Sequence, residues 1–170
     1  MKDCNAGILT EEELRGSAGY TIDAARERGG AIVLIECVED IPCNPCETVC
    51  PFGAITVGVP ITNTPVVDIE KCNGCGQCVA VCPGLAVFLV NHDAGDGMAE
   101  FTFPYEYLPT PEKGDIVKAT DRAGKEVCEA EVVKVASSPK YSLTNVITIR
   151  FRTEHIKDVR GIQRLMLSEQ

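Results

Sequence analysis

Short apolar segments recur through the first half of the chain, each bounded by polar, glycine or proline residues. They cover residues 31–35, 54–59, 65–69 and 86–90. Their length and their content of Val and Ile are typical of short β-strands. The pattern therefore predicts four strands, one on each side of two cysteine-rich stretches.

The residues before these segments have the pattern of two short helices. Thr10 and Glu13 have the spacing of a capping box, which indicates a helix that begins at residue 11. Residues 21–28 predict a second helix, which Gly29 and Gly30 end. We therefore expect a helical extension over residues 1–30.

The last part of the chain predicts a loop followed by a small β-rich module, residues 93–170. Residues 93–115 contain three prolines and read as a loop, whereas 115–120, 126–136 and 145–152 read as strands. In the last strand Ile147, Ile149 and Phe151 share one face, and Arg150 and Arg152 share the other. These two arginines either meet an acidic partner or form a solvated face. Residues 156–167 have a weak helical pattern that Gly161 interrupts.

Composition narrows the class of protein. The 170 residues include ten cysteines and carry a formal net charge of −9, which argues against a nucleic-acid partner. No apolar run has the length of a signal peptide or a membrane span. We therefore expect a cytoplasmic protein, in which reduced thiols indicate metal binding and not disulfides.

The cysteines form an internal repeat. Residues 72–83, CNGCGQCVAVCP, have the spacing C-x₂-C-x₂-C-x₃-C-P, which is typical of [4Fe–4S] ligands. Gly74 and Gly76 suit a crowded loop around a cluster. A shift of 32 residues aligns the end of this run with an earlier one: Cys75, Cys78, Cys82 and Pro83 match Cys43, Cys46, Cys50 and Pro51. Each copy predicts a strand, a cysteine loop, a short helix and a strand.

The first copy lacks the cysteine expected at position 40, which is an aspartate. Cys37 lies at the end of the preceding strand, six residues before Cys43, so the spacing is C-x₅-C. We interpret Cys37 as the displaced ligand. The alternative is a buried strand cysteine beside a three-ligand [3Fe–4S] centre. The enlarged loop, residues 38–42, either tunes a cluster or contacts a partner.

Residues 37–51 and 72–83, with their flanking strands, resemble the bacterial two-[4Fe–4S] ferredoxin family over about residues 31–92. The resemblance implies an α+β fold with a ferredoxin-like pseudo-twofold core. It also implies two [4Fe–4S] clusters in which the last cysteine of each copy serves the other cluster. The expected ligands are Cys37, Cys43, Cys46 and Cys82 for cluster 1, and Cys72, Cys75, Cys78 and Cys50 for cluster 2. Zinc is the rival metal, but its sites use paired CxxC units and not two interleaved runs.

The cysteines and histidines outside the two motifs do not indicate a catalytic site. Cys128 alternates with Ala130 and Val132 on a strand and reads as a core residue. Cys4 could serve as a surrogate ligand, but Cys37 is far better placed. His92 and His155 have no ligand-like neighbours in the sequence. The chain contains no Ser/His/Asp set, phosphate loop or dinucleotide fingerprint.

We therefore expect a chain that is not an enzyme on its own. It transfers electrons as the iron-sulfur subunit of a larger hetero-oligomeric oxidoreductase, with a flavoprotein as catalytic partner. Two alternatives stay open: a free-standing soluble ferredoxin, and a non-redox structural or sensing module. Residues 31–92 carry six acids and one base, which fits electrostatic docking of a diffusible carrier.

Overall fold

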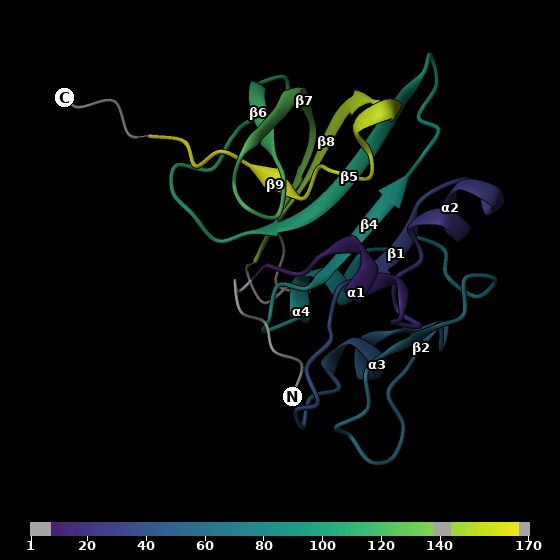
Figure 1. Cartoon of the computed structure of the whole chain (residues 1–170). Helices are drawn as coiled ribbons and strands as arrows, with labels where there is room; N and C mark the ends of the chain where they lie inside the picture. The colour runs from purple at the N-terminus through teal and green to yellow at the C-terminus, as the bar shows by residue number, and fades with distance from the viewer. Residues whose placement is uncertain (1–7, 138–143, 167–170) are drawn as a thin grey trace.

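The computed structural model describes residues 8–137 and 144–166 and has a mixed α/β fold. Its larger sheet has seven strands, all paired antiparallel, in the order β1-β4-β5-β8-β7-β6-β9 (Figure 1). The strands are β1 Ile32–Ile35, β4 Val87–Asn91, β5 Met98–Tyr105, β6 Ile116–Thr120, β7 Glu126–Ala136, β8 Asn145–Arg152 and β9 Gly161–Ile162.

The cysteine-rich region contains the four strands and two helices that the repeat predicts. Helix α3 (Pro45–Val49) precedes β2 (Ile55–Thr56), and α4 (Gln77–Val81) lies between β3 (Val66–Val67) and β4. β1 pairs with β4, and β2 pairs with β3 in a separate small sheet. The first strand of each copy therefore pairs with the last strand of the other. In Figure 1, α3 and β2 lie at the end of the molecule opposite β6 and β7.

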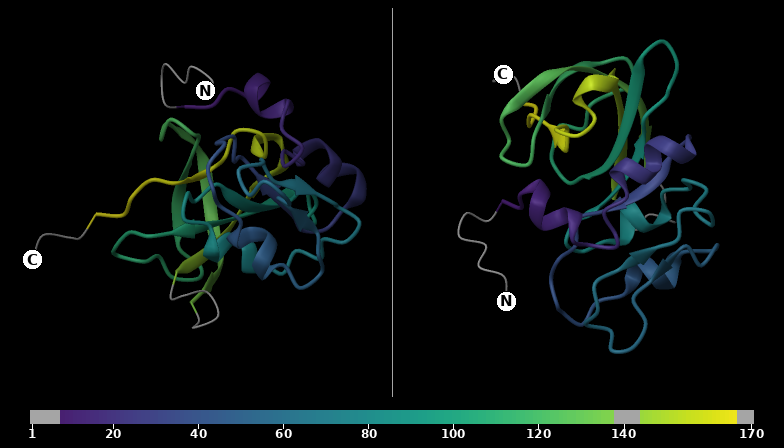
Figure 2. Two further views of the ribbon diagram at one scale, coloured as in Figure 1. Left: turned by 90° about the horizontal axis from the view of Figure 1, so that it is seen from below. Right: turned by 45° about the vertical axis from the view of Figure 1, so that its right-hand side comes forward.

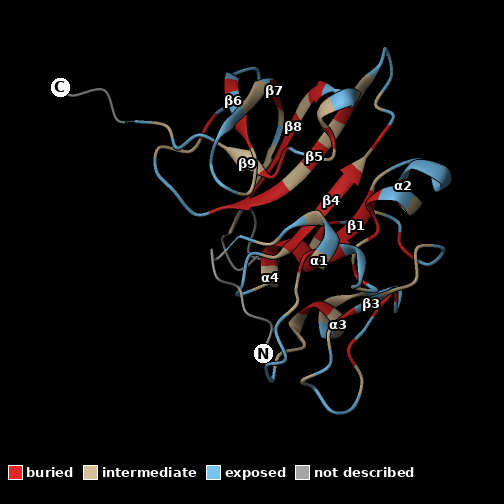
Figure 3. Ribbon diagram, viewed as in Figure 1, coloured by how far each residue is buried: buried red, intermediate tan, exposed pale blue. Residues whose placement is uncertain are grey.

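The N-terminal residues form the two predicted helices, α1 (Glu11–Arg15) and α2 (Ile22–Arg28). The predicted capping box is present: the Glu13 N–H donates to the Thr10 hydroxyl, and the Thr10 N–H donates to Oε2 of Glu13. The hydroxyl of Thr21, just before α2, donates to the Val33 carbonyl on β1 at 2.5 Å. The contact from Thr21 holds the start of α2 against β1, which is buried along its whole length (Figure 3).

The prediction of a loop over residues 93–115 is wrong for β5. Apolar and polar residues alternate from Ala99 to Phe103, and Phe101 is fully buried. β4 and β8 pair with β5 on its two sides, so it is an internal strand. This pairing satisfies the backbone of β5, and its proline, Pro104, lies near the end of the strand. One sheet consequently runs from the cysteine-rich region into the C-terminal strands.

The predicted strands β6, β7 and β8 are confirmed, and Ile147, Ile149 and Phe151 are buried as expected. The helical prediction for residues 156–167 is wrong within the described part of that segment. A 3-10 turn at Thr153–His155 is followed by β9. The Arg160 N–H donates to the Thr120 carbonyl at 2.7 Å, so the free edge of β6 holds this segment as a strand. The right-hand view of Figure 2 shows these C-terminal strands curving into a ring.

The two arginines on β8 do not form a free basic stripe. Nη2 of Arg150 lies 2.6 Å from Oε1 of Glu100, the residue opposite it on β5. Arg152 is exposed. The charge of Arg150 is therefore engaged within the sheet, and the stripe is a weaker candidate for docking than the sequence suggests.

Candidate functional site

The structure gathers eight cysteines around α3, α4 and the loops that precede them. The thiols of Cys82, Cys43 and Cys37 lie within electrostatic range of Cys46. We call these four the first group. Cys78 interacts electrostatically with Cys72, Cys75 and Cys50, and less strongly with Cys46. Cys50, Cys72, Cys75 and Cys78 are the second group.

The two groups are formed by an exchange between the copies. Cys50 ends α3 of the first copy but lies in the second group. Cys82 ends α4 of the second copy but lies in the first group. The structure thus brings together the same sets that the family resemblance assigns to the two clusters. Assignment of each thiol as a ligand remains a prediction.

The second group lines one small cavity. All four of its cysteines contribute to the wall. The other lining residues are mostly apolar and include Val33, Ile55 and Leu89. Four sulfur donors that converge on a mostly apolar cavity fit an iron-sulfur cluster.

Backbone N–H groups point at the sulfur atoms of both groups. Three such contacts are present: Val33 to Cys72 (3.4 Å), Ala54 to Cys50 (3.3 Å) and Ala86 to Cys82 (3.4 Å). Ala54 and Ala86 occupy equivalent positions in the two copies, four residues after the last cysteine. Donation to sulfur stabilises the more electron-rich state of a cluster, so these contacts help to set its reduction potential.

Burial disfavours the thiolate form at three of these cysteines. It raises the pKa of Cys46 to about 11 and raises the pKa values of Cys37 and Cys78 above their ordinary range. Iron binds the thiolate form and lowers the pKa of a coordinating thiol, so a bound cluster would offset this effect of burial.

A single-ion site is a poorer fit. In residues 8–137 and 144–166, no three His, Cys, Asp or Glu side chains converge closely enough to hold one metal ion. A tetrahedral zinc ion draws its four sulfurs to about 2.3 Å from one point. A four-iron cluster is larger and separates its thiolates more widely. The arrangement therefore favours clusters over zinc.

In the cysteine loop of the second copy, the backbone at Gly74 lies very close to the backbone of Ala31. Gly74 has φ of +70°, and a Cβ atom there would lie 2.5 Å from the carbonyl oxygen of Ala31. Only glycine allows both this conformation and this contact. The close approach presses the loop that carries Cys72 and Cys75 against the start of β1.

The enlarged first-copy loop begins at Cys37, which is half-buried at the end of β1. Burial raises the pKa of the Cys37 thiol, and the backbone of Glu39 opposes this shift. The next residues, Asp40 and Ile41, are exposed. The insertion therefore lies close to Cys37 and also presents side chains at the surface.

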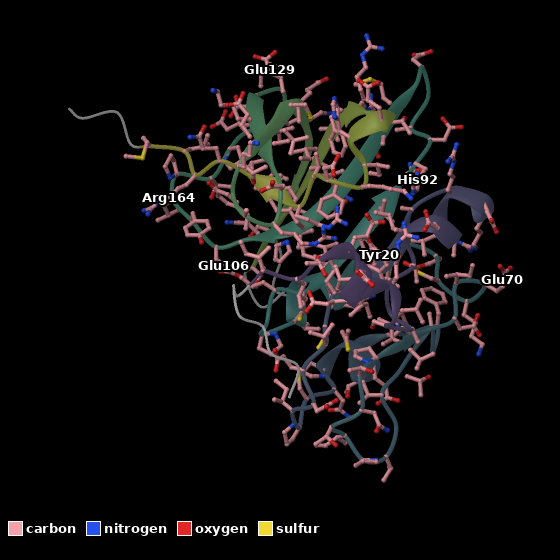
Figure 4. The ribbon with its side chains drawn as sticks, viewed as in Figure 1. Tyr20, Glu70, His92, Glu106, Glu129 and Arg164 are labelled. Carbon is pink, nitrogen blue, oxygen red and sulfur yellow. The ribbon has the colours of Figure 1, made fainter. Side chains whose placement is uncertain are left out.

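The residues outside the two groups have structural surroundings. Cys128 is half-buried against the core, as expected. His92 is buried and its Nε2–H donates to the Ile22 carbonyl at 2.7 Å, which joins β4 to α2 (Figure 4). His155 lies beside Glu154. Cys4 falls outside the described residues.

One set of residues near the first group was not predicted from the sequence. Glu36 is buried immediately before Cys37, and its carboxylate bonds Arg122 and Arg160 from the C-terminal strands. A charged residue at the end of an apolar strand is a local signal of burial with a partner. Its partners are 86 and 124 residues away, so the sequence could not identify them.

Comparisons with known proteins agree with the cysteine pattern. Residues 36–86 match the 4Fe-4S dicluster domain. One subunit of the Na⁺-translocating ferredoxin:NAD⁺ oxidoreductase complex of Acetobacterium woodii is 49% identical over 45 residues, 26% of this chain and 13% of that protein. The corresponding subunit of an ion-translocating oxidoreductase complex of Methanosarcina acetivorans is 36% identical over 70 residues, 41% of this chain and 25% of that protein.

An uncharacterized ferredoxin of Methanocaldococcus jannaschii is 42% identical over 50 residues, 29% of this chain and 31% of that protein. The chain thus spans less than a third of the length of each of these relatives. No solved structure matches the chain significantly. None of the helices in the described ranges has the length and apolar character needed to cross a membrane.

Proposed function

Residues 36–86 are a 4Fe-4S dicluster domain that carries two [4Fe–4S] clusters, and we propose that the chain is the electron-transfer subunit of a larger oxidoreductase complex. The observation that carries the proposal is the exchange of Cys50 and Cys82 between the two groups. It sets two cluster sites side by side in one domain, as a path for single electrons requires.

We assign Cys37, Cys43, Cys46 and Cys82 to cluster 1, and Cys50, Cys72, Cys75 and Cys78 to cluster 2. The underlying core is a ferredoxin-like pseudo-twofold unit. Two observations support it: each copy pairs its first strand with the last strand of the other, and α3 packs against α4.

When bound, the clusters supply one-electron redox chemistry. The chain binds them, shields them from water and places N–H groups at their sulfur atoms. Thiolates hold the iron, and apolar side chains such as Val33 and Leu89 exclude water. N–H groups at sulfur favour the reduced state. Cys75 is exposed, so an electron leaves or enters most easily on that side of the second group.

A flavin-containing partner fits the chemistry of such a complex. The relative from A. woodii is named as part of a ferredoxin:NAD⁺ oxidoreductase complex. NAD⁺ takes two electrons as a hydride, whereas an iron-sulfur cluster carries one at a time, so a flavin is a suitable converter between them. We place the complex in the cytoplasm, where the thiols that bind iron remain reduced.

Anaerobic purification from the native source tests the subunit assignment. We expect the chain to co-elute with at least one larger, flavin-containing protein. Reduction of that flavin should be followed by reduction of the clusters. Elution of the native protein alone, at the mass of one chain, would overturn the subunit assignment but not the cluster assignment.

The acidity of the cluster region favours one alternative, a diffusible ferredoxin. Residues 31–92 have a net charge of −5, which would attract a basic partner and speed encounter at low salt. This function requires an electron-transfer rate that falls steeply with ionic strength. A rate that is insensitive to salt rules out the diffusible carrier.

A further inference from the structure

A buried carboxylate joins the cysteine-rich region to the C-terminal strands. Glu36 follows β1 directly and is 8% exposed. Arg122, in the turn between β6 and β7, donates from Nε to Oε2 at 2.9 Å and from Nη2 to Oε1 at 2.5 Å. Arg160, just before β9, donates from Nε to Oε1 at 2.7 Å. Both oxygens of Glu36 are therefore bound by guanidinium groups.

Glu36, Arg122 and Arg160 together carry one negative and two positive charges. The single carboxylate of Glu36 accepts from both guanidinium groups, so one acid faces two arginines. The side chain of Arg160 is 4% exposed, and its guanidinium lies over the ring of Phe101.

Nη1 of Arg160 donates to the carbonyls of Ile156 and Val159, whereas its Nη2 has no hydrogen-bond partner among the described residues. The side chain of Arg122 is 19% exposed. Oδ1 of the neighbouring Asp121 accepts two N–H groups within the turn. The three side chains therefore keep an excess of positive charge in a largely buried position, where screening by water is weak.

Glu36 also contacts the segments that carry Cys37 and Cys82, two thiols of the first group. Glu36 precedes Cys37 in the chain, and its N–H donates to the Ala86 carbonyl at 2.8 Å. The N–H of Ala86 in turn donates to the sulfur of Cys82 at 3.4 Å. Cys37 and Cys82 belong to different copies and lie within electrostatic range of each other. Glu36 thus bridges the segments that present them.

The second copy has no equivalent arrangement. The residue before its first cysteine is Lys71, which is more than half exposed and pairs with Asp68 at the surface. The insertion after Cys37 also leaves that cysteine without the short tether that the C-x₂-C spacing gives Cys72. Cluster 1 therefore needs an anchor that cluster 2 does not need.

We propose that Arg122 and Arg160, acting through Glu36, position Cys37 and Cys82 on cluster 1 and raise the reduction potential of that cluster alone. The C-terminal strands then tune one of the two centres. Positive charge near a cluster stabilises its reduced form, and this gives the effect its sign. The inference rests on the proposed ligand assignment.

Two neutralising variants test the proposal, because they remove charges of opposite sign. Each is made in the full chain, purified without oxygen, and titrated redox-potentiometrically with EPR of both centres. Glu36→Gln should raise the potential of one centre, and Arg122→Gln should lower the potential of the same centre. The other centre should not move. A purely structural role would shift the potential in the same direction in both variants.

Both variants should also loosen Cys37. We expect a [3Fe–4S] signal in a fraction of the oxidised protein, absent from the wild type. Arg122→Lys keeps the charge but loses the two-pronged hydrogen bond, so it should restore the potential and still show the [3Fe–4S] signal. This variant also keeps the test decisive if Arg122→Gln does not fold.

Glu100→Gln is the matched control, because it breaks the Glu100–Arg150 pair between β5 and β8 of the same sheet. It should leave both potentials and the iron content unchanged. Equal shifts of both centres, shifts of the same sign in the two neutralising variants, or a control that behaves like them would overturn the proposal. A wild-type protein without two iron-sulfur centres would instead refute the proposed function.

Discussion

In the proposed ligand assignment, Cys37 is the residue that decides whether cluster 1 has four protein ligands or three. It lies at the end of β1, three residues earlier than the motif spacing requires, and Cys43 and Cys82 are close to it. The sequence could identify Cys37 because the repeat shows where a cysteine is missing. The sequence could not show that the neighbouring Glu36 is buried in an ion pair with Arg122 and Arg160, because these arginines are distant in the chain. They lie beside Glu36 only because the sheet curves.

Replacement of Cys37 with serine should remove one ligand of cluster 1. A hydroxyl binds iron less well than a thiolate does, so the iron content should fall from about eight to about seven per chain. A [3Fe–4S] EPR signal should appear in the oxidised protein. Cys128→Ser is the control, since Cys128 lies on β7 outside both groups, and it should keep about eight iron. Full iron content and unchanged spectra in Cys37→Ser would show that Cys37 is not a ligand.

His92 should make stability depend on pH. Burial is the main cause that lowers its pKa below 6.5, and the nearby charges of Arg26 and Lys157 add to this. The hydrogen bond to the Ile22 carbonyl and the charge of Asp23 oppose the shift without cancelling it. The unfolded chain therefore binds a proton at a higher pH than the folded chain does. Stability is fully present above the unfolded pKa and is lost as pH falls through the window between the two values.

Thermal unfolding of the wild type and His92→Gln, from about pH 7.5 to about pH 5.5, measures this effect. Glutamine keeps an N–H donor for the Ile22 carbonyl but does not titrate. The midpoint of the wild type should fall more steeply below about pH 6.5 than that of the variant. Parallel curves for the two proteins would exclude His92 as the cause.

The elements differ in how far their local sequence determines them. The strands that flank the cysteine loops, the capped helix α1 and the strands β6 to β8 follow from local apolar patterns and caps. β5 and β9 do not. β5 is a strand because β4 and β8 pair with it on both sides, and prolines near it masked the alternation of its residues. β9 is only two residues long and depends on the free edge of β6.

The loop between β3 and α4 gives a test at the scale of one element. In Gly74→Ala the new Cβ meets the Ala31 carbonyl, and the left-handed backbone adds strain of about 1–2 kcal/mol. The loop must then move away from β1 and take Cys72 and Cys75 with it. We expect loss of cluster 2 in much of the protein, with iron falling towards about four per chain.

Gly84→Ala is the matched control for this test. A Cβ at Gly84 meets no atom within 4 Å, although Gly84 also lies close to a cysteine in the sequence. Iron content should stay at about eight. If Gly74→Ala also kept its full iron content, the tight fit of this loop against β1 would not be required for the cluster.

At the scale of the whole molecule, one antiparallel sheet connects the cysteine-rich region with the C-terminal strands. The sequence predicts a β-rich module after residue 92 but not its continuity with β4, which results from strand pairing between distant segments. The same continuity brings Arg122 and Arg160 to Glu36. The residues after position 92 therefore contact the segment that carries Cys37, which we assign to cluster 1.

The presence of two clusters in this one molecule can be measured as the iron and acid-labile sulfide content of the anaerobic protein, combined with EPR of its reduced form. Two [4Fe–4S] clusters predict about eight iron and about eight sulfide per chain. Because the two cluster sites share one small domain, the reduced spectrum should show two interacting centres. Zinc in place of iron, or a protein without acid-labile sulfide, would contradict the assignment of the two clusters.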